Sequence, residues 1–375
     1  MRQIKNINII KDPKYTVLIA PLDWGLGHAT RCIPLIEKLL IVGFKVIIAA
    51  EGDQKILLQS AFPELEFVHL SGYKLKYGTT GLSTILKIIF QIPKILTAIN
   101  RENKWLRNFI KSKHLDVVIA DNRFGMHNKK IISIFITHQL LIKTSAGKFT
   151  DTLVQKINYH FINQFNYCWI PDAAGEINLA GELSHPATKP KNKILYTGVL
   201  SGINKENITV TNKLLIILSG PEPQRSIIEK ILLEQLKNYT HPVILVRGLP
   251  SANEIISAGE GITIYNFLSG LQLQQVINMS EIIISRSGYS TIMDLLPLGK
   301  KCIFIPTPGQ AEQEYLANRM AFNNYAVIGY QNNFSLLPMI QKAENLQIPD
   351  LSALKMPGNA IEIIAALITQ LDTQE

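Results

Sequence analysis

A run of polar residues in the C-terminal third of the chain has the types and spacing to hold a phosphorylated polyol. Ser287 and Gly288 interrupt an apolar run, and Ser290 and Thr291 then open an expected helix. The free N–H groups and positive end of a helix start attract an anion. Asp294, one turn further on, can accept hydrogen bonds from paired sugar hydroxyls. Thr291 and Asp294 also fit a capping box, so the alternative is that Asp294 only caps its helix.

A second polar loop follows the next apolar segment, Cys302 to Ile305, which Pro306 and Pro308 close. The residues after it carry amides and carboxylates, a chemistry suited to polyols: Gln310, Glu312, Gln313 and Glu314. Ligands of open α/β sheets bind at the edge where the carboxyl ends of parallel strands lie. We therefore expect both loops to face one ligand.

Near the N-terminus, a strand-to-helix loop offers a base for proton transfer. Gly25 and Gly27 predict a tight turn after Asp23, and His28 and Arg31 follow at the expected helix start. The helix dipole favours a neutral imidazole there, and a neutral imidazole can accept a proton. Asp23 can orient that ring or act as the base itself. The alternative is that His28 only bonds backbone groups and Arg31 is a solvated helix residue.

Three more strand ends carry polar residues. Asp121 follows an apolar strand, His138 comes just after the next one, and both should lie at the edge that His28 occupies. For His138, loop-end hydrogen bonding is the alternative to substrate binding. In the second half, the N–H groups of Ser219 and Gly220 can meet a phosphate, with Arg225 as counter-charge, although neighbouring prolines reduce the supply of N–H groups.

The elements that must position these residues alternate as strands and helices, which predicts parallel sheets and two α/β domains. We expect domains at 1–200 and 201–375, joined by the polar segment 201–212. Apolar runs indicate strands at 16–20, 45–50, 65–70, 115–120, 131–136, 167–170, 194–197, 214–218, 243–246, 262–265, 281–285 and 302–305.

These loops resemble a known family. The pattern R-S-G-x-x-T-x-x-D from Arg286 to Asp294, followed by P-x-P-x-Q-x-E-Q-x-x-x-A-N, is similar to the nucleotide-sugar half of family 28 glycosyltransferases. The resemblance is dense over residues 214–330 and thinner before them, where G-x-G-H-x-x-R, ending at Arg31, is similar to the family's acceptor-side loop. The family has Glu where this chain has Asp294, which is one methylene shorter.

The resemblance implies a GT-B fold, with two Rossmann-like domains facing across a cleft and the final helix, 358–372, packing back on the first domain. It implies an inverting, metal-independent transferase that uses a nucleotide sugar, with UDP as the expected nucleotide. The best-known family member adds N-acetylglucosamine to lipid I, so the acceptor is expected to be a lipid hydroxyl. Phe267 stands where the family holds the base by backbone atoms, and His138 where it closes a strand with His-Glu or His-Gln.

The charge, the cysteines and the apolar runs of the sequence indicate where the protein is expected to act in the cell. Residues 1–200 carry a net charge of +12 and residues 201–375 one of −3, so the first domain should face an anionic partner. The three cysteines lie far apart without a C-x-x-C motif, which favours a reducing compartment. No signal peptide or apolar run long enough to span a bilayer is visible. We expect a cytoplasmic protein, with no nucleic-acid partner because no nucleic-acid-binding motif is present.

The stretch 82–113 is amphipathic and strongly basic, and Pro93 is expected to bend or split its helix. Helices of this kind can lie on an anionic membrane, here the inner face of the cell membrane. An ordinary core helix with a solvated basic face is the alternative. The basic residues are Lys87, Lys94, Arg101, Lys104, Arg107, Lys111 and Lys113.

Other functions remain open at this point. A nucleotide-sugar hydrolase or epimerase of the same fold is one, because a hydrolase of pseudaminic acid synthesis has a similar G-x-G-H-x-x-R-C loop, here Gly25 to Cys32. Such a hydrolase needs no basic acceptor surface. A non-catalytic sensor of sugar nucleotides is another. The sequence contains no D-x-D, no H-E-x-x-H and no His/Cys cluster, so no metal or other cofactor is expected.

Overall fold

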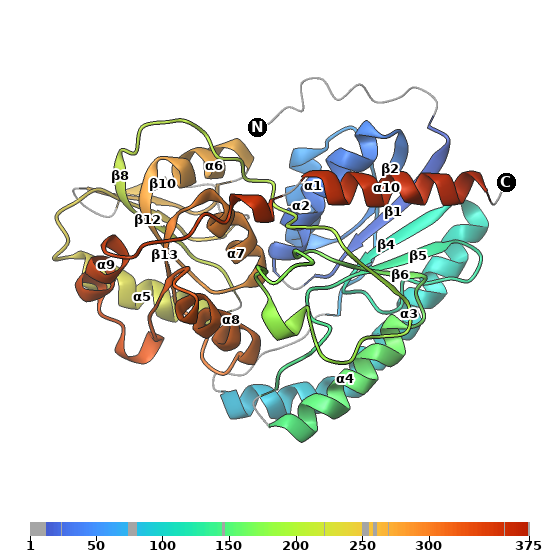
Figure 1. Cartoon of the computed structure of the whole chain (residues 1–375), viewed down its shortest axis with the longest axis horizontal. Helices are drawn as coiled ribbons and strands as arrows, with labels where there is room; N and C mark the ends of the chain where they lie inside the picture. The colour runs from blue at the N-terminus through green and yellow to red at the C-terminus, as the bar shows by residue number, and fades with distance from the viewer. Residues whose placement is uncertain are drawn as a thin grey trace. The chain divides into compact units, whose positions relative to one another are not determined.

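The chain forms two compact α/β units. The computed structural model describes residues 13–23, 25–73, 81–144, 147–220, 222–249, 255–257, 261–268, 270–355 and 357–373. One unit contains most of the chain before residue 201 together with Leu354 onward, and the other contains residues 201–353 (Figure 1). We call them the N-terminal unit and the C-terminal unit.

The N-terminal unit is built on a parallel sheet whose strand order reverses once. Its strands are paired in the order β3-β2-β1-β4-β5-β6-β7, and every pair is parallel. The order reverses between β1 and β4, which is where open sheets of this type bind ligands. The strands are β1 (Tyr15–Pro21), β2 (Phe44–Ala49), β3 (Glu66–Val68), β4 (Val117–Asp121), β5 (Ile132–Ile136), β6 (Tyr167–Ile170) and β7 (Lys193–Tyr196).

Helices α1 (Gly27–Ile41), α2 (Gly52–Ala61), α3 (Gly81–Ser112), α4 (Lys148–Ile162) and α10 (Pro357–Asp372) accompany this sheet. Helix α3 continues through Pro93, so of the two predicted effects, a bend or a split, the split is wrong. The side chains of residues 81–92, including that of Lys87 in the predicted amphipathic stretch, lie outside the described residues.

The last helix belongs to the N-terminal unit although it is last in sequence. The hydroxyl of Tyr15 and the ammonium of Lys14 donate to Asp372, at 2.5 and 2.6 Å. The Tyr167 hydroxyl donates to Gln370. In Figure 1 this helix, drawn in red, runs past α1 and the first strands. The chain therefore returns to the first sheet after completing the second.

The C-terminal unit has a second sheet with the strand order β10-β11-β9-β8-β12-β13-β14. All pairs are parallel except β10 with β11, an edge pair that the sequence did not predict. Its strands are β8 (Asn212–Ile217), β9 (Val243–Val246), β10 (Ile255–Ser257), β11 (Ile262–Tyr265), β12 (Ser280–Ser285), β13 (Lys301–Phe304) and β14 (Val327–Ile328). Its helices are α5 (Gln224–Leu236), α6 (Gly270–Asn278), α7 (Tyr289–Leu295), α8 (Ala311–Phe322) and α9 (Leu336–Glu344).

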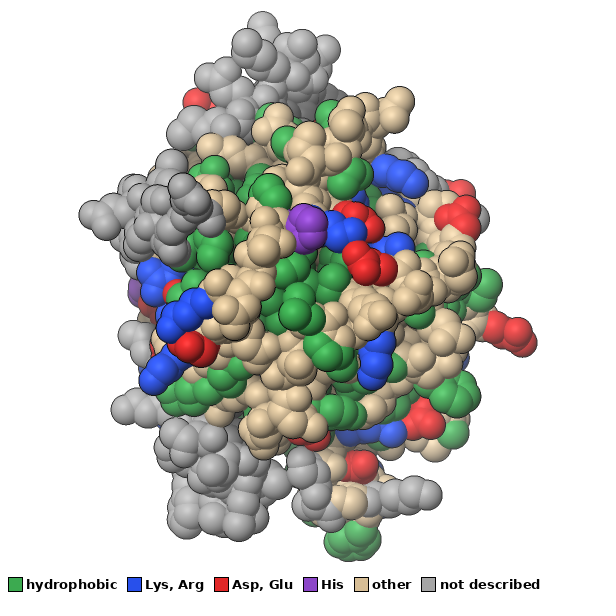
Figure 2. All heavy atoms as spheres, turned by 90° about the vertical axis from the view of Figure 1, so that its left-hand side faces the viewer, with side chains coloured by type: hydrophobic (Ala, Val, Ile, Leu, Met, Phe, Trp, Pro, Cys, Tyr) green, Lys and Arg blue, Asp and Glu red, His purple; other side chains and the backbone are tan. Residues whose placement is uncertain are grey.

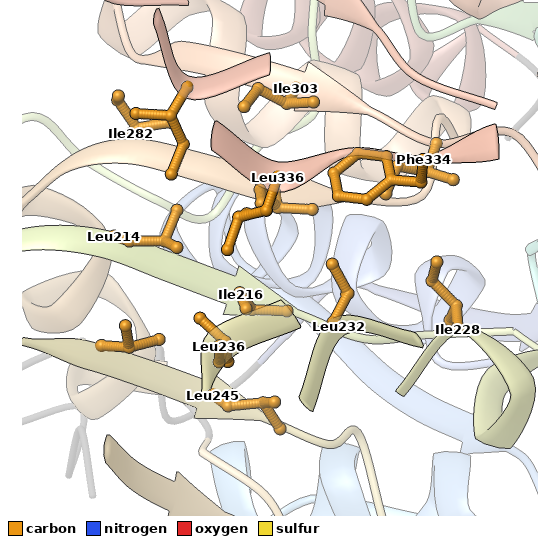
Figure 3. Close-up of a cluster of buried hydrophobic side chains, with 14 of the residues drawn as sticks. Leu214, Ile216, Ile228, Leu232, Leu236, Leu245, Ile282, Ile303, Phe334 and Leu336 are labelled. Carbon is orange, nitrogen blue, oxygen red and sulfur yellow. The ribbon is translucent and has the colours of Figure 1, made fainter. Parts of the chain in front are cut away.

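One face of this sheet is covered by a closely packed apolar cluster. Leu214 and Ile216 of β8, Ile282 of β12 and Leu232 of α5 are fully buried within it (Figure 3). Phe334 and Leu336 close the cluster from the segment that enters α9. Apolar burial of this kind is the main stabilising term of the fold, and it fixes the strand ends that carry the polar loops.

Charges of both signs mix on the face of the molecule shown in Figure 2, where blue and red side chains lie close together among apolar and neutral ones. In the C-terminal unit, Lys213 pairs with Glu281 at 3.0 Å and with Glu344 at 2.6 Å. This face shows no continuous basic field.

Candidate active site

The predicted base lies at the reversal point of the first sheet. Helix α1 begins at Gly27, so His28 is its second residue and follows β1 closely. Asp121 is the last residue of β4, directly beside Pro21 at the end of β1. His138 follows β5, the next strand. The parallel register thus brings His28, Asp121 and His138 to one edge of the sheet.

Asp121 holds this group together. Its carboxylate has no exposed surface and accepts from the Arg31 guanidinium, with Nε at 2.6 Å from Oδ2 and an Nη in contact with Oδ1. The His28 Nδ1 lies 3.0 Å from the same Oδ1. Arg31 also reaches His138, at 3.4 Å from Nη1 to Nδ1. A buried carboxylate is therefore paired with a buried guanidinium and aligned with an imidazole.

Electrostatics favours an ionised Asp121 and a neutral His28. Burial opposes ionisation of Asp121, but Arg31 and His28 outweigh it and hold the pKa of Asp121 well below its usual value. For His28, burial is the largest influence and lowers its pKa below 6.5; Asp121 raises that pKa and Arg31 lowers it. The imidazole is thus ready to accept a proton near neutral pH. The sequence attributed its neutrality to the helix dipole, whereas burial is the main cause.

The position of the ring proton decides what His28 can do. Nδ1 faces Asp121 Oδ1 at 3.0 Å and an Arg31 Nη at 2.7 Å. With the proton on Nδ1, the ring donates to the carboxylate and Nε2 is left to accept a proton from substrate. With the proton on Nε2, Nδ1 accepts from Arg31 instead. Only the first arrangement makes a base.

Two of the predicted substrate contacts are placed differently from the expectation. Asp121 is completely buried, and Arg31 is only 3% exposed. Both act on His28 and on each other, so neither presents its charge on the surface. The prediction that they bind substrate is therefore corrected to a positioning role. His138 is also buried, and it lies beside Arg31 and Gln139. The Nε2 atom of Gln139 is 3.4 Å from the Nε2 atom of His138.

Asp23 does not orient the histidine. Its Oδ1 accepts from the Tyr73 N–H at 3.0 Å, and a Cβ on Gly72 would fall 1.9 Å from its Oδ2. The ring of His28 is held by Asp121 and Arg31 within the part of the chain that the structure describes. Asp23 instead anchors the backbone of residues 72–73, where only glycine fits beside it.

A second buried ion pair supports the same loop and was missed from the sequence. Arg123 and Glu102 are 0% and 2% exposed and form a 2.8 Å pair. Arg123 also donates to the carbonyls of Pro21 and Ser71, and the Tyr73 hydroxyl donates to Glu102 at 2.9 Å. A signal existed: Glu102 is the only acidic residue between Lys87 and Lys113.

In the C-terminal unit, the turn after β8 keeps part of its predicted chemistry. Gly220 adopts a φ of +101°, and helix α5 begins only at Gln224. Arg225 is buried between Glu222 and Glu229, at 2.5 and 2.6 Å. Glu229 is shared with Arg247, which lies 2.6 Å from it. The roles of Arg225 as a counter-charge and of the Ser219 and Gly220 N–H groups as a phosphate site stay predictions.

The loop after β12 is organised by Arg286. This residue is 2% exposed and donates to the carbonyls of Gln224, Ile305 and Pro306 and to the Gln331 side chain. Burial lowers the pKa of Arg286 to about 10. Among the described residues no carboxylate bonds to it. Arg286 thus braces the ends of β12 and β13 against the start of α5, with its positive charge retained.

Helix α7 starts earlier than predicted. It begins at Tyr289 with Gly288 as its N-cap, and the cap makes no side-chain hydrogen bond. Thr291 is therefore inside the helix and the predicted capping box with Asp294 is wrong. Asp294 instead accepts from the Ser201 hydroxyl, at 2.6 Å. Gly299 ends the following turn with a φ of +71°.

The remaining predicted contacts lie on the segments that follow β11, β12 and β13. Ser290 and Phe267 are partly exposed. Ser287 is buried and donates to the Gln313 carbonyl at 2.8 Å. Gln313 and Glu314 fold their own loop, because they accept from the N–H groups of Thr307 and Gly309 at 2.9 and 2.8 Å. Gln310 precedes α8 as its N-cap and Glu312 lies in its first turn, both partly exposed. No group of three His, Cys, Asp or Glu able to hold a metal occurs among the described residues.

Comparison with known proteins supplies an independent line of evidence. Residues 214–371 match the glycosyltransferase family 28 C-terminal domain. Over 380 residues the chain is 30% identical to the UDP-N-acetylglucosamine–N-acetylmuramyl-(pentapeptide) pyrophosphoryl-undecaprenol N-acetylglucosamine transferase of Clostridium perfringens (strain ATCC 13124). That match covers 95% of this chain and 98% of the relative.

Two solved structures show the same fold. The spinosyn forosaminyltransferase SpnP superposes with a TM-score of 0.64 at 12% identity, covering 96% of this chain and 100% of that one. MurG of Acinetobacter baumannii superposes with a TM-score of 0.54 at 15% identity, with the same coverage. The fold is therefore GT-B, as the sequence predicted.

The two neighbours of His28 should move its pKa in opposite directions. Asp121→Asn removes the charge that raises the His28 pKa, so this pKa should fall below the wild-type value. Arg31→Gln removes a charge that lowers it, so the pKa should rise. NMR titration of the ring of His28 in both variants measures the two shifts. Shifts of the same sign would contradict the arrangement described here.

Proposed function

The chain belongs to glycosyltransferase family 28, and on that premise we propose that it transfers a sugar from a UDP-linked donor to a hydroxyl group of a membrane lipid, with inversion and without a metal ion. The observation that carries the proposal is the imidazole of His28, whose Nδ1 lies 3.0 Å from the buried Asp121 carboxylate at the edge where open α/β sheets bind ligands. The lowered pKa values of His28 and Asp121 favour a neutral ring beside an ionised carboxylate. The Clostridium perfringens relative is named for a UDP-linked sugar and a pyrophosphoryl-undecaprenol acceptor, which supports the same two substrate classes here.

In the proposed reaction, His28 is the general base. Its Nδ1–H donates to Asp121, and Nε2 takes the proton of the acceptor hydroxyl as the oxygen attacks the anomeric carbon of the donor. The bond from that carbon to the diphosphate oxygen breaks, and its electron pair leaves with the diphosphate. Asp121 stabilises the imidazolium that forms, as a carboxylate does for the histidine of a hydrolase triad.

The C-terminal unit is proposed to bind the donor. Backbone N–H groups at Ser219–Gly220 and at the start of α7 meet the diphosphate, and the retained charge of Arg286 adds a positive potential behind that helix start. Asp294 is proposed to take the ribose hydroxyls, and Phe267 lies in the loop proposed to hold the base. Gln310 and Glu312 remain candidates for the sugar because Gln313 and Glu314 are used to fold their own loop.

The proposed membrane contact involves α3 and α4. Helix α3 buries Ala98, Ile99 and Glu102 and exposes basic side chains, which are Lys94, Arg101, Lys104, Arg107 and Lys111. Helix α4 leaves an apolar stripe exposed at a spacing of four residues, made of Phe149 at 86%, Leu153 at 52% and Ile157 at 52%. Apolar insertion together with basic attraction is how peripheral proteins bind an anionic bilayer. The basic face predicted from sequence is thus joined by an apolar one that it missed. No helix in the described ranges has the length and apolar character needed to cross a membrane.

Reversal of charge on α3 should weaken the proposed membrane contact. Lys104→Glu with Lys111→Glu changes two exposed residues on one helix face, each basic residue near a bilayer contributing about 1 kcal/mol. Sedimentation with phosphatidylglycerol vesicles should show a loss of binding of more than tenfold. Lys129→Glu with Lys130→Glu makes the same change of charge on an exposed loop of the same unit and should retain binding. Equal losses in both variants would refute a role for α3.

The activity itself is tested with a panel of nucleotide sugars, with and without extracted membrane lipid, by following nucleotide release. Transfer predicts release that requires lipid and yields a glycosylated lipid. Turnover at the same rate without lipid would overturn the proposal and favour a nucleotide-sugar hydrolase. Binding without turnover under either condition would instead favour a sensor of sugar nucleotides.

The role of His28 is tested by the pH dependence of turnover. His28→Ala should lower turnover about 10²- to 10⁴-fold, the usual range for general acid–base catalysis. Because the pKa of His28 is lowered, the wild-type rate should rise with pH through a value below 6.5 and stay flat above it. Asp23→Asn should keep the rate within a few-fold. If His28→Ala keeps both rate and profile while Asp23→Asn loses them, Asp23 is the base.

A further inference from the structure

The segment that follows the N-terminal unit is bonded to the carboxylate proposed to bind ribose. Ser201 is the first residue of the C-terminal unit, and its hydroxyl donates to Asp294 Oδ1 at 2.6 Å. The same Oγ accepts from the Ile203 N–H at 3.1 Å. Ser201 is only 6% exposed, so this is an enclosed, charge-assisted contact.

The residues after Ser201 are bonded to helix α6. The N–H groups of Asn204 and Glu206 donate to the side chains of Gln274 and Asn278, at 2.8 and 3.0 Å. Asn278 in turn donates to the Asn204 carbonyl at 2.9 Å. We call residues 201–206 the strap. One part of the strap therefore depends on α6, whereas its first residue depends on Asp294.

A serine hydroxyl and a ribose hydroxyl are chemically equivalent as donors to a carboxylate. The Ser201 contact therefore marks the Asp294 Oδ1 position as one that accepts a hydroxyl proton at normal hydrogen-bond distance. A ribose diol bound by both carboxylate oxygens needs that position. A carboxylate has about four acceptor sites, but a diol that bridges both oxygens of Asp294 has to share Oδ1 with the enclosed Ser201 hydroxyl, which lies 2.6 Å from it.

We propose that Ser201 competes with the donor ribose for Asp294, so that binding of a nucleotide displaces the Ser201 side chain and releases the start of the strap. This rests on the proposed role of Asp294 as the ribose ligand. Each donor molecule must replace an existing charge-assisted bond, and only a ligand with two hydroxyls gains more bonds than it breaks. Ser201 thus lowers affinity for the nucleotide and links occupancy to the conformation of the strap.

Calorimetric titration with UDP tests the competition. Ser201→Ala removes the competitor and should bind UDP about tenfold more tightly, which corresponds to about 1.4 kcal/mol. Ser201→Thr retains a hydroxyl and should stay close to wild type. If Ser201 only shapes the site, Ser201→Ala should bind UDP with unchanged or weaker affinity. Either result would overturn the proposal.

Amide hydrogen exchange provides a readout that does not depend on affinity. The Ile203 N–H is bonded to Ser201 Oγ, so saturation with UDP should speed its exchange. The N–H groups of Asn204 and Glu206 are bonded to α6 and should exchange as before, which makes them internal controls. Slower or unchanged exchange at Ile203 would contradict the displacement.

Asp294→Ala separates failure of this inference from failure of the donor site. If Asp294 binds the ribose, Asp294→Ala should weaken UDP binding by at least tenfold, in line with loss of charge-assisted bonds. Weaker binding in Asp294→Ala without tighter binding in Ser201→Ala refutes the competition and leaves the donor site in place. Unchanged affinity in Asp294→Ala refutes the role of that carboxylate, and with it the competition.

Discussion

The proposed site of the N-terminal unit depends on one buried carboxylate. Asp121 has no exposed surface, and burying an isolated charge is strongly unfavourable unless it is paired and hydrogen-bonded. Arg31 provides the pairing, and the ring of His28 provides a further bond. Removal of one partner of such a pair typically destabilises a protein by about 3–5 kcal/mol. The end of β4 and the first turn of α1 therefore depend on each other, and His28 receives its orientation from that assembly. Burial is the main cause of its lowered pKa.

A second buried ion pair extends the constraint to the neighbouring loop. Glu102 comes from the inner face of α3, whose outer face is basic, and Arg123 follows Asp121 by two residues. Asn122 between them adopts a φ of +54°, a conformation that asparagine tolerates better than most residues. This turn directs Asp121 and Arg123 into separate ion pairs. The helix proposed to contact lipid is thus bonded to the segment that follows β4.

Features that depend on local sequence pattern were mostly predicted correctly. Apolar runs located nearly every strand of both sheets, and the glycine turn located His28 at the start of α1. Partners that come from distant segments could not be predicted, because nothing near Asp121 indicates that Arg31 will neutralise it or that it will be fully buried. The same reason explains why the ion pairs of Arg225 were not predicted: Glu222 and Glu229 are visible in the sequence, but their distances from the guanidinium are not.

Two further features, the Ser201–Asp294 contact and the exposed apolar stripe of α4, could not be predicted because tertiary packing determines them. A serine in a polar linker gives no sign that it will reach a carboxylate 93 residues further on. Phe149, Leu153 and Ile157 have helical spacing, which indicates an apolar face, but whether such a face is buried is decided by tertiary packing.

The tautomer of His28 is the property on which the proposed chemistry rests most directly. Nitrogen-15 NMR of the histidine ring, recorded at neutral pH without substrate, distinguishes a protonated from an unprotonated ring nitrogen. The account predicts a proton on Nδ1, donated to Asp121, and an unprotonated Nε2. A proton on Nε2, with Nδ1 accepting from Arg31, would contradict the assignment of His28 as the general base.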